Sequence, residues 1–323
     1  MIQIGLIGIA AGAAAALLFA SVASGAWFSV ALFYLAPLPI MIAALGWSHW
    51  AAMIAAASGA FALAAVFGSV FFFAFLAGAG LPAWWLGYLA MLARPVPNGG
   101  APSPLEWYPS GRLVLWAAIL AAMIVIVAIP NFGSDATSFH AGLHDALMHI
   151  LRAETTAPAD APTPIPGLSN IDRLVDFLIV AVPPAAAVVA TVTSLVNLWL
   201  AGRIVKFSGL LKRPWPQLAA MAFPRSVLGV LAGAMILSFF GGLAGIVAGV
   251  LSASLLMAYG VLGLAVLHAI TRGRSRGFLL SGTYAAVIVF GWPVLALCGL
   301  GLFEAAFDLR ARVGRRRGPP ART

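Results

Sequence analysis

Formal charge is almost missing from the amino-terminal part of the chain. None of the first 93 residues is Asp, Glu, Lys or Arg, so the first formal charge is Arg94, and no acid occurs between Phe177 and Phe303. A globular surface needs ionic groups to stay dispersed in water, so a water-soluble fold of this size is excluded. Charged residues make up 8% of the chain and hydrophobic residues 63%. We therefore expect a polytopic membrane protein.

Residue patterns typical of enzymes are also absent. The chain has no Gly-rich phosphate loop with Lys, no His-Glu-x-x-His and no Gly-x-Ser-x-Gly, and its apolar segments hold too few acids for paired-carboxylate catalysis. The single cysteine, Cys298, excludes an intrachain disulfide. The sequence thus predicts neither an enzyme nor a cofactor. Active transport would need ion coupling or an energising partner, because this chain carries no ATPase motif.

Long apolar runs are what the chain does contain. At about 20 residues for each crossing, they predict an all-α polytopic transmembrane bundle of eight or nine membrane segments, in a single integral membrane domain over 1–323. The fourth run is too short for a full crossing and follows Gly78, Gly80 and Pro82, so we expect a half-helix or one arm of an uneven hairpin. The runs are 3–22, 27–46, 50–77, 81–93, 112–130, 174–202, 226–247, 249–270 and 278–303.

The hydrophilic connections predict the orientation of the bundle. The segment 203–225 carries five bases and no acid, whereas 131–173 carries most of the acids. Since Lys and Arg stay on the cytoplasmic side, we expect 203–225 and the basic tail 309–323 in the cytoplasm and 131–173 outside. The chain is accordingly predicted to be a multi-pass protein of a bacterial inner membrane. Its arginine-rich tail is expected to contact anionic membrane lipid, and no nucleic-acid partner is expected.

The last apolar run raises a topological problem. If 278–303 crossed once, the arginines of 272–276 and those of the tail would lie on opposite sides, against the charge rule. A re-entrant hairpin that turns at Trp292 and Pro293 would keep both on the same side. Each arm would then be short for a bilayer, and we expect this arrangement.

The predicted outer loop contains one amphipathic helix. Phe139, Leu143, Leu147 and Leu151 recur at helical spacing and form its apolar side, which is typical of a helix lying at the membrane interface. His140 and His144 have the i, i+4 spacing that can hold one metal ion. Two ligands do not make a zinc site, which needs three or four, so no metal site is predicted.

Five motifs carry a resemblance to a known family. The chain resembles the YybS-like family of predicted polytopic bacterial membrane proteins, a domain of unknown function, and it is distantly similar to the S-components of energy-coupling-factor vitamin transporters. The first likeness implies architecture, and the second implies a ligand-binding subunit with a possible energising or coupling partner. The motifs are Asn197-Leu-Trp-Leu-Ala-Gly-Arg203-Ile-Val, Arg213-Pro-Trp-Pro216, Gly263-Leu-Ala-Val-Leu-His268, Gly299-Leu-Gly-Leu-Phe and Phe307-Asp-Leu-Arg-Ala-Arg312.

The first helix carries a stripe of small residues. Gly8, Gly12, Ala16 and Ala20 recur every four residues, so they line up as a flat face that another helix can approach closely. Internal packing against a neighbouring helix is one interpretation. The similarity to S-components implies a second, in which this face meets a coupling subunit.

Polar side chains inside apolar runs are the candidates for ligand binding, because each is costly in hydrocarbon unless it has a polar partner. Thr191, Ser194 and Asn197 form one stripe, and we favour Asn197 because Ser and Thr can bond to their own helix. Glu304 is expected to pair with the tail arginines 310 and 312, or else with Arg225, His268 or a bound cation. The candidates are Asn197, Thr191, Ser194, Tyr259, His268 and Glu304.

These observations predict an integral membrane protein that binds a small molecule or lipid-like ligand in a transport role. The alternative is a non-transporting scaffold in envelope assembly or maintenance. A transporter should enclose a roomy polar cavity near the middle of the membrane, whereas a scaffold should be packed solid there.

Overall fold

The computed structural model describes residues 1–96, 105–155, 171–271 and 276–316. Among these, seven helical segments are long and apolar enough to cross a membrane, which confirms the predicted all-α polytopic bundle. Three shorter apolar helices accompany them. The seven segments are Ile2–Ser24, Ser29–Gly46, His49–Phe67, Ser69–Ala90, Ser110–Asn131, Arg173–Phe207 and Gly242–Ile270.

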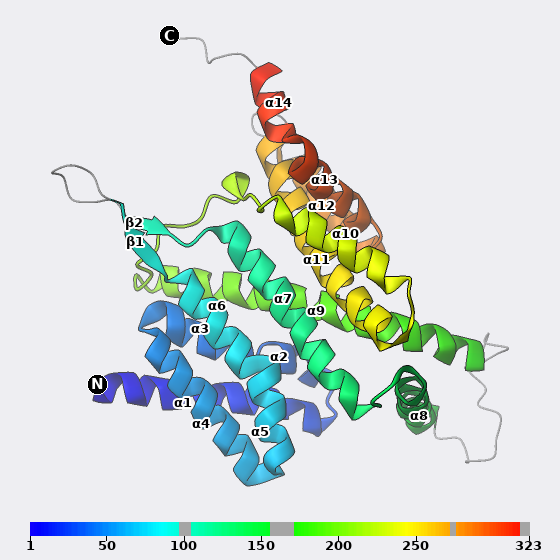
Figure 1. Ribbon diagram of the computed structural model, residues 1–323. Coiled ribbons are helices and arrows are strands. Elements are labelled where there is room, and N and C mark those ends of the chain that lie inside the picture. The colour runs from blue at the N-terminus through cyan, green and yellow to red at the C-terminus, as the bar shows by residue number, and fades with distance from the viewer. Residues whose placement is uncertain (97–104, 156–170, 272–275, 317–323) are drawn as a thin grey trace, which may run out of the picture.

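The amino-terminal elements form one side of the molecule, coloured blue to cyan in Figure 1. Buried alanines of α1, α3, α4 and α6 supply much of their shared core, together with Phe19, Ile40 and Phe75. Small side chains let helices approach closely, and close packing drives helix association where lipid removes the hydrophobic effect. The elements are α1 (Ile2–Ala20), η1 (Ser21–Ser24), α2 (Ser29–Tyr34), α3 (Pro37–Gly46), α4 (His49–Phe67), α5 (Ser69–Phe75), the π turn η2 (Leu76–Gly80) and α6 (Leu81–Ala90).

The break between the third and fourth spans lies at Gly68, so the prediction of a break near Gly78 was wrong. Gly68 has φ 94°, which glycine adopts without steric cost, and it separates α4 from α5. From there the chain stays helical through α5, η2 and α6. Pro82 follows this π turn in the first turn of α6, where proline is tolerated, so it lies inside a full-length span.

The remaining elements, coloured green to red in Figure 1, lie beside this amino-terminal layer. Helices α7 and α9 lie between the amino-terminal layer and the last five helices. The break before α11 lies at Gly241 and Gly242, both with positive φ, and not at 247–249 as predicted. The elements are α7 (Ser110–Ala128), η3 (Ile129–Asn131), α8 (Ala136–Thr155), α9 (Ile171–Phe207), η4 (Leu218–Ala220), α10 (Ser226–Ser238), α11 (Gly242–Ile270), α12 (Arg276–Phe290), α13 (Pro293–Phe307) and α14 (Leu309–Arg316).

The last apolar run is divided into two helices. Gly291 has φ 69° and separates α12 from α13, each of 15 residues, one residue before the predicted turn. Helix α13 then lies along α11, where Gly263 and Gly301 remove the side chains that would otherwise separate the backbones: a Cβ on Gly263 would meet the Leu297 carbonyl oxygen. The two short helices therefore bring α14 back to the end of α11, as the hairpin prediction requires (Figure 1).

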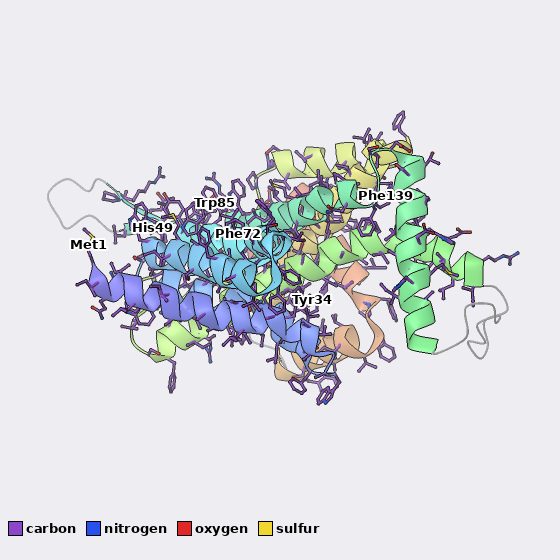
Figure 2. All side chains as sticks on the ribbon, turned by 90° about the horizontal axis from the view of Figure 1, so that it is seen from below. Met1, Tyr34, His49, Phe72, Trp85 and Phe139 are labelled. Atoms are coloured by element: carbon purple, nitrogen blue, oxygen red, sulfur yellow. The ribbon has the colours of Figure 1, made fainter. Side chains whose placement is uncertain are left out.

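The two ends of the bundle differ. Figure 2 shows Met1 and His49 at one end and Phe139 of α8 at the other, with α8 standing across the remaining helices. The apolar side of α8 packs on the protein, and not on a membrane surface as predicted, because Phe139 and Leu143 lie against Ile129, Val175 and Ile179. The arginines at 272 and 274, the connection 156–170 and the tail beyond 316 lie outside the described residues.

A short hairpin lies in the connection between the predicted runs 81–93 and 112–130. Strands β1 (Ala93–Pro95) and β2 (Leu105–Trp107) pair antiparallel, with Arg94 opposite Glu106. Their ion pair measures 2.7 Å, and the two side chains are 78% and 50% exposed. Opposite charges facing each other across strands stabilise such a pair weakly.

Candidate functional site

A cavity of about 560 Å³ lies between the amino-terminal layer and the helices α7 and α9. It is open to the outside of the bundle, where Ala74, Ala185 and Val189 of its lining are exposed. It follows α9 from Val182 to Ser194, which at 1.5 Å per residue is a length of about 18 Å in the middle of that helix. The lining is apolar except for Tyr34, Thr193 and Ser194. The other lining residues are Phe19, Phe33, Pro37, Ala74, Gly78, Ala79, Ile124, Val125, Val182, Ala185, Ala186, Val189 and Ala190.

Small residues and prolines explain why this space is open. Pro183 and Pro184 lie inside α9 at one end of the cavity, and because proline lacks an N–H, two helical hydrogen bonds are missing there. The facing wall contains Gly78 of the π turn η2, where an added Cβ would meet no atom within 4 Å. Alanines such as Ala186 and Ala190 line the wall that α9 contributes. The sequence therefore leaves room on both sides of this gap.

Asn197 joins α9 to the break between α2 and α3. Its Nδ2 donates to the backbone oxygen of Tyr34 at 2.8 Å and to that of Thr193 at 2.9 Å. The backbone N–H of Leu38, the helical partner for the Tyr34 oxygen, donates to Leu35 instead, so Asn197 satisfies a carbonyl that the helix break leaves open. Asn197 is 1% exposed, and its Oδ1 has no hydrogen-bond partner among the described residues.

The rest of the predicted polar stripe divides between two roles. The hydroxyl of Thr191 donates to the backbone oxygen of Ala187 at 2.8 Å, so it is satisfied within its own helix, which is one of the roles expected for Ser and Thr. Ser194 lines the cavity, together with Thr193 and Tyr34. The cavity thus has its polar groups at the end nearest Asn197.

Tyr259 and His268 lie on α11, away from this cavity. Tyr259 is fully buried against Phe223, with ring centroids 5.3 Å apart, and its hydroxyl has no partner within the described part of the chain. The Nδ1 of His268 lies 2.8 Å from the backbone oxygen of Leu264, and its ring contacts Tyr284. The structure therefore does not bring these two candidates together with Asn197.

Glu304 forms a buried ion pair with Arg310, one of the two predicted tail partners. Its Oε1 accepts from the Arg310 Nε at 2.6 Å, its Oε2 accepts from the Arg310 backbone N–H at 3.0 Å, and the residue is 5% exposed. Asp308, in a left-handed conformation with φ 51°, turns the chain so that α14 can reach back. Asp308 itself pairs with Arg225 at 3.3 Å. Glu304 therefore stabilises the end of α13 and does not face the cavity.

The small-residue face of the first helix packs inside the bundle. A Cβ on Gly8 would lie 2.8 Å from the Ala51 carbonyl oxygen, and one on Gly12 would lie 2.5 Å from that of Ala55, so α4 covers this face. Ala16 is also buried, whereas Ala20 is partly exposed. This is the internal-packing interpretation, and it leaves no room for a partner helix on the same stripe.

The two histidines of α8 do not form a metal site in the part of the chain that the structure describes. No group of three or more potential ligands is found there. His140 is exposed, and the Nδ1 of His144 lies 3.7 Å from Asp145.

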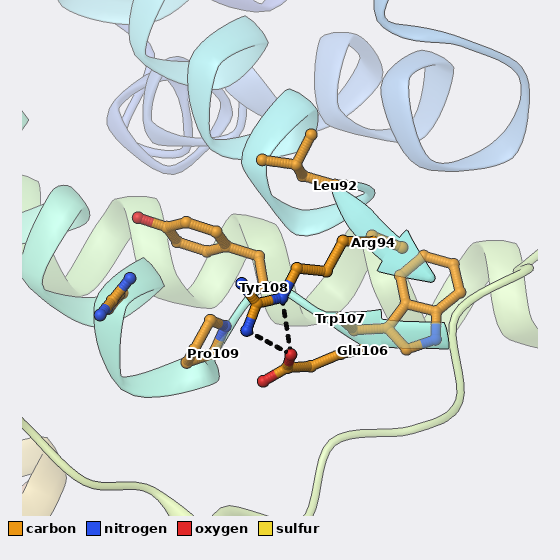
Figure 3. Close-up of a pocket in the computed structure, with 8 residues that line it drawn as sticks. Leu92, Arg94, Glu106, Trp107, Tyr108 and Pro109 are labelled. Carbon is orange, nitrogen blue, oxygen red and sulfur yellow. Dashed lines mark hydrogen bonds and ion pairs between the residues drawn. The ribbon is translucent and has the colours of Figure 1, made fainter. Parts of the chain in front are cut away.

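The end opposite α8 has features that the sequence did not single out. A surface hollow of about 470 Å³ lies beside the hairpin. Figure 3 shows some of its lining residues, with the Arg94 guanidinium in contact with Glu106 and near Tyr108 and Pro109. Nearby, Arg213 donates to the backbone oxygens of Ala90 at 2.7 Å and of Tyr108 at 2.8 Å. Burial lowers the pKa of the Arg213 guanidinium, which still stays charged at neutral pH.

Comparison of the chain with known protein families, with curated proteins and with solved structures finds no match.

Proposed function

We propose that this integral membrane protein binds a lipid-like molecule in the cavity between α7, α9 and the amino-terminal layer, and that it acts in the transport of that molecule. The observation that carries the proposal is the cavity itself. Its volume of about 560 Å³ is within the range of roughly 300–1,000 Å³ typical of ligand sites. The likeness to the YybS-like family and to S-components stays a prediction alongside it.

The lining of the cavity selects the class of ligand. A polar solute would have to exchange its hydrogen bonds with water for a wall that offers hydroxyls at one end only, and each unpaired polar group would cost several kcal/mol, roughly 2–7. An acyl or isoprenoid chain makes no such demand. Tyr34, Thr193 and Ser194 can bond one polar group of such a molecule, so we expect a long apolar ligand with a small polar end.

The same cavity favours the transport proposal over the scaffold alternative. A scaffold needs helices packed against each other along their length, whereas here about 18 Å of the middle of α9 borders a cavity. The expectation of a polar cavity is revised, because the lining is mostly apolar.

Filling the cavity is the direct test. Gly78→Leu would place a large side chain in it without a backbone clash, because nothing lies within 4 Å of that position. Gly229→Leu on α10 is the matched control: it is equally open and does not line the cavity. Each protein would be purified in mild detergent, and its retained lipid would be extracted and identified by mass spectrometry. We expect a retained apolar lipid in the wild type and the control, and its loss in Gly78→Leu.

A second assay addresses transport. Proteoliposomes carrying a fluorescent derivative of the retained lipid would be treated with a membrane-impermeant quencher, and protein-dependent movement between leaflets would be followed. Equal lipid retention in both variants would refute binding in this cavity. Lipid retention without protein-dependent movement between leaflets would refute the transport role but not lipid binding.

A further inference from the structure

A cluster of two cations and two tryptophans lies at the end of α9, on the side of the molecule opposite α8. The guanidinium carbon of Arg203 is 5.9 Å from the ring centroid of Trp199 and 5.7 Å from that of Trp215. The Lys206 Nζ is 5.1 Å from the same Trp215 ring. Both cations are within the range of about 6 Å over which the face of an aromatic ring attracts a positive charge. We refer to Trp199, Arg203, Lys206 and Trp215 as the Trp215 cluster.

The local sequence fixes the position of Trp215. Pro214 and Pro216 restrict the backbone on both sides of it. Its ring packs on α9 at Gly202, where a Cβ would lie 3.5 Å from the ring, at ordinary van der Waals contact. Arg213 ties the segment to α6 and to the residue after β2 through its two backbone hydrogen bonds. The ring is therefore held by its surroundings and does not depend on the cations that contact it.

The positive charge of the cluster is not neutralised within the described residues. The side chains of Arg203 and Lys206 form no ion pair and no hydrogen bond there, and the acids of the chain lie elsewhere in sequence, with none between Phe177 and Phe303. Contact with a ring face leaves the in-plane N–H donors of a guanidinium available. Both side chains are exposed, so an anion from outside the protein can reach them.

An apolar pocket of about 160 Å³ adjoins these cations. Its wall is formed by Trp199, Gly202 and Trp215 of the same region and continues along α9 to Leu198 and Leu195. A free phosphate ion would use only the cations, whereas a phospholipid would use both features, with its phosphate at Arg203 and Lys206 and part of a chain in the pocket. Tryptophan is typical of the depth at which phospholipid headgroups lie.

We infer that the Trp215 cluster is a binding site for the headgroup of an anionic membrane phospholipid. The inference does not depend on the proposed function, because this pocket and the larger cavity share no lining residue. A zwitterionic lipid carries a positive group that Arg203 and Lys206 would repel. The site should therefore discriminate between headgroups even when the acyl chains are the same.

The test compares two lipids on the full-length protein in detergent. Phosphatidylglycerol and phosphatidylcholine with identical chains would be titrated and the bound lipids counted by native mass spectrometry. We expect tighter binding of phosphatidylglycerol, weakened about fivefold by Arg203→Gln and about thirtyfold by Arg203→Gln with Lys206→Gln. The control is Arg112→Gln, since Arg112 is also exposed and lies outside both the Trp215 cluster and the arginine-rich tail.

Three outcomes would overturn the inference. The first is equal affinity for the two lipids, and the second is an equal loss in the Arg112 variant, which would indicate a general charge effect. The third is full displacement of the lipid by inorganic phosphate at equal concentration, which would indicate an anion site without a role for the acyl chain. Unchanged thermal unfolding of the variants would show that the loss of binding does not come from misfolding.

Discussion

The contact between α1 and α4 makes a quantitative prediction about Gly12. In Gly12→Ala the new methyl group would lie 2.5 Å from the Ala55 carbonyl oxygen and 3.0 Å from the Gly59 nitrogen, and it would also meet the Ser58 hydroxyl. Ordinary contact begins at 3.4 Å, so the two helices would have to separate by about 0.9 Å. Overpacking of this kind costs about 1–3 kcal/mol.

Gly5→Ala is the matched control on the same helix, because nothing lies within 4 Å of that position. Replacing glycine by alanine inside a helix stabilises it by about 1 kcal/mol, and this gain applies to both variants. We therefore expect Gly5→Ala to be more stable than the wild type by up to about 1 kcal/mol. Gly12→Ala should be less stable than Gly5→Ala by the whole overpacking cost, about 1–3 kcal/mol.

The free energy of unfolding would be measured in mixed micelles by titration with a denaturing detergent, followed by circular dichroism. Equal stability of Gly12→Ala and Gly5→Ala would refute the close approach of α1 and α4. It would also reopen the interpretation of this face as a docking surface for another subunit.

Two further predictions concern buried polar groups. Glu304→Gln should lower the free energy of unfolding by about 3–5 kcal/mol, because it leaves Arg310 without its buried carboxylate. Arg94→Gln breaks an exposed ion pair, so it should lower the free energy of unfolding by less than about 1 kcal/mol. Equal losses of stability in the Arg94 and Glu304 variants would contradict the burial of Glu304. Asn197→Leu should lower the free energy of unfolding by about 1–3 kcal/mol, because the Tyr34 carbonyl loses its donor. An unchanged unfolding midpoint would show that this hydrogen bond does not stabilise the fold.

The fold class could be predicted from the sequence because lipid-facing segments exclude charge. The amphipathic helix from Phe139 to Leu151 could also be predicted, since its apolar positions follow the helical period. The break at Gly68 could not: its neighbours are apolar, so hydropathy does not change there. Only the positive φ of Gly68 distinguishes it from a glycine inside a helix.

For the candidate site, sequence reasoning singled out Asn197, which the structure places next to the cavity's polar end but not in its lining, so its role in ligand binding stays a prediction. An amide inside an apolar run needs a partner, and the structure supplies one across the bundle at Tyr34 and a second four residues back at Thr193. The Trp215 cluster was not among the candidates, because cations are expected in any loop that the sequence places on the cytoplasmic side. Its signal was the spacing of Trp199 and Arg203, four residues apart on one helix face.

Helix α8 limits the direction from which a molecule can enter the larger cavity. It packs on Ile129 of α7 and on Val175 and Ile179 of α9, so protein covers the ends of these helices just beyond the cavity. A hydrophobic guest would then arrive sideways from the surrounding bilayer. Its occupancy would follow its mole fraction among the lipids and not its concentration in water, so adding more membrane at a constant amount of guest would empty the protein.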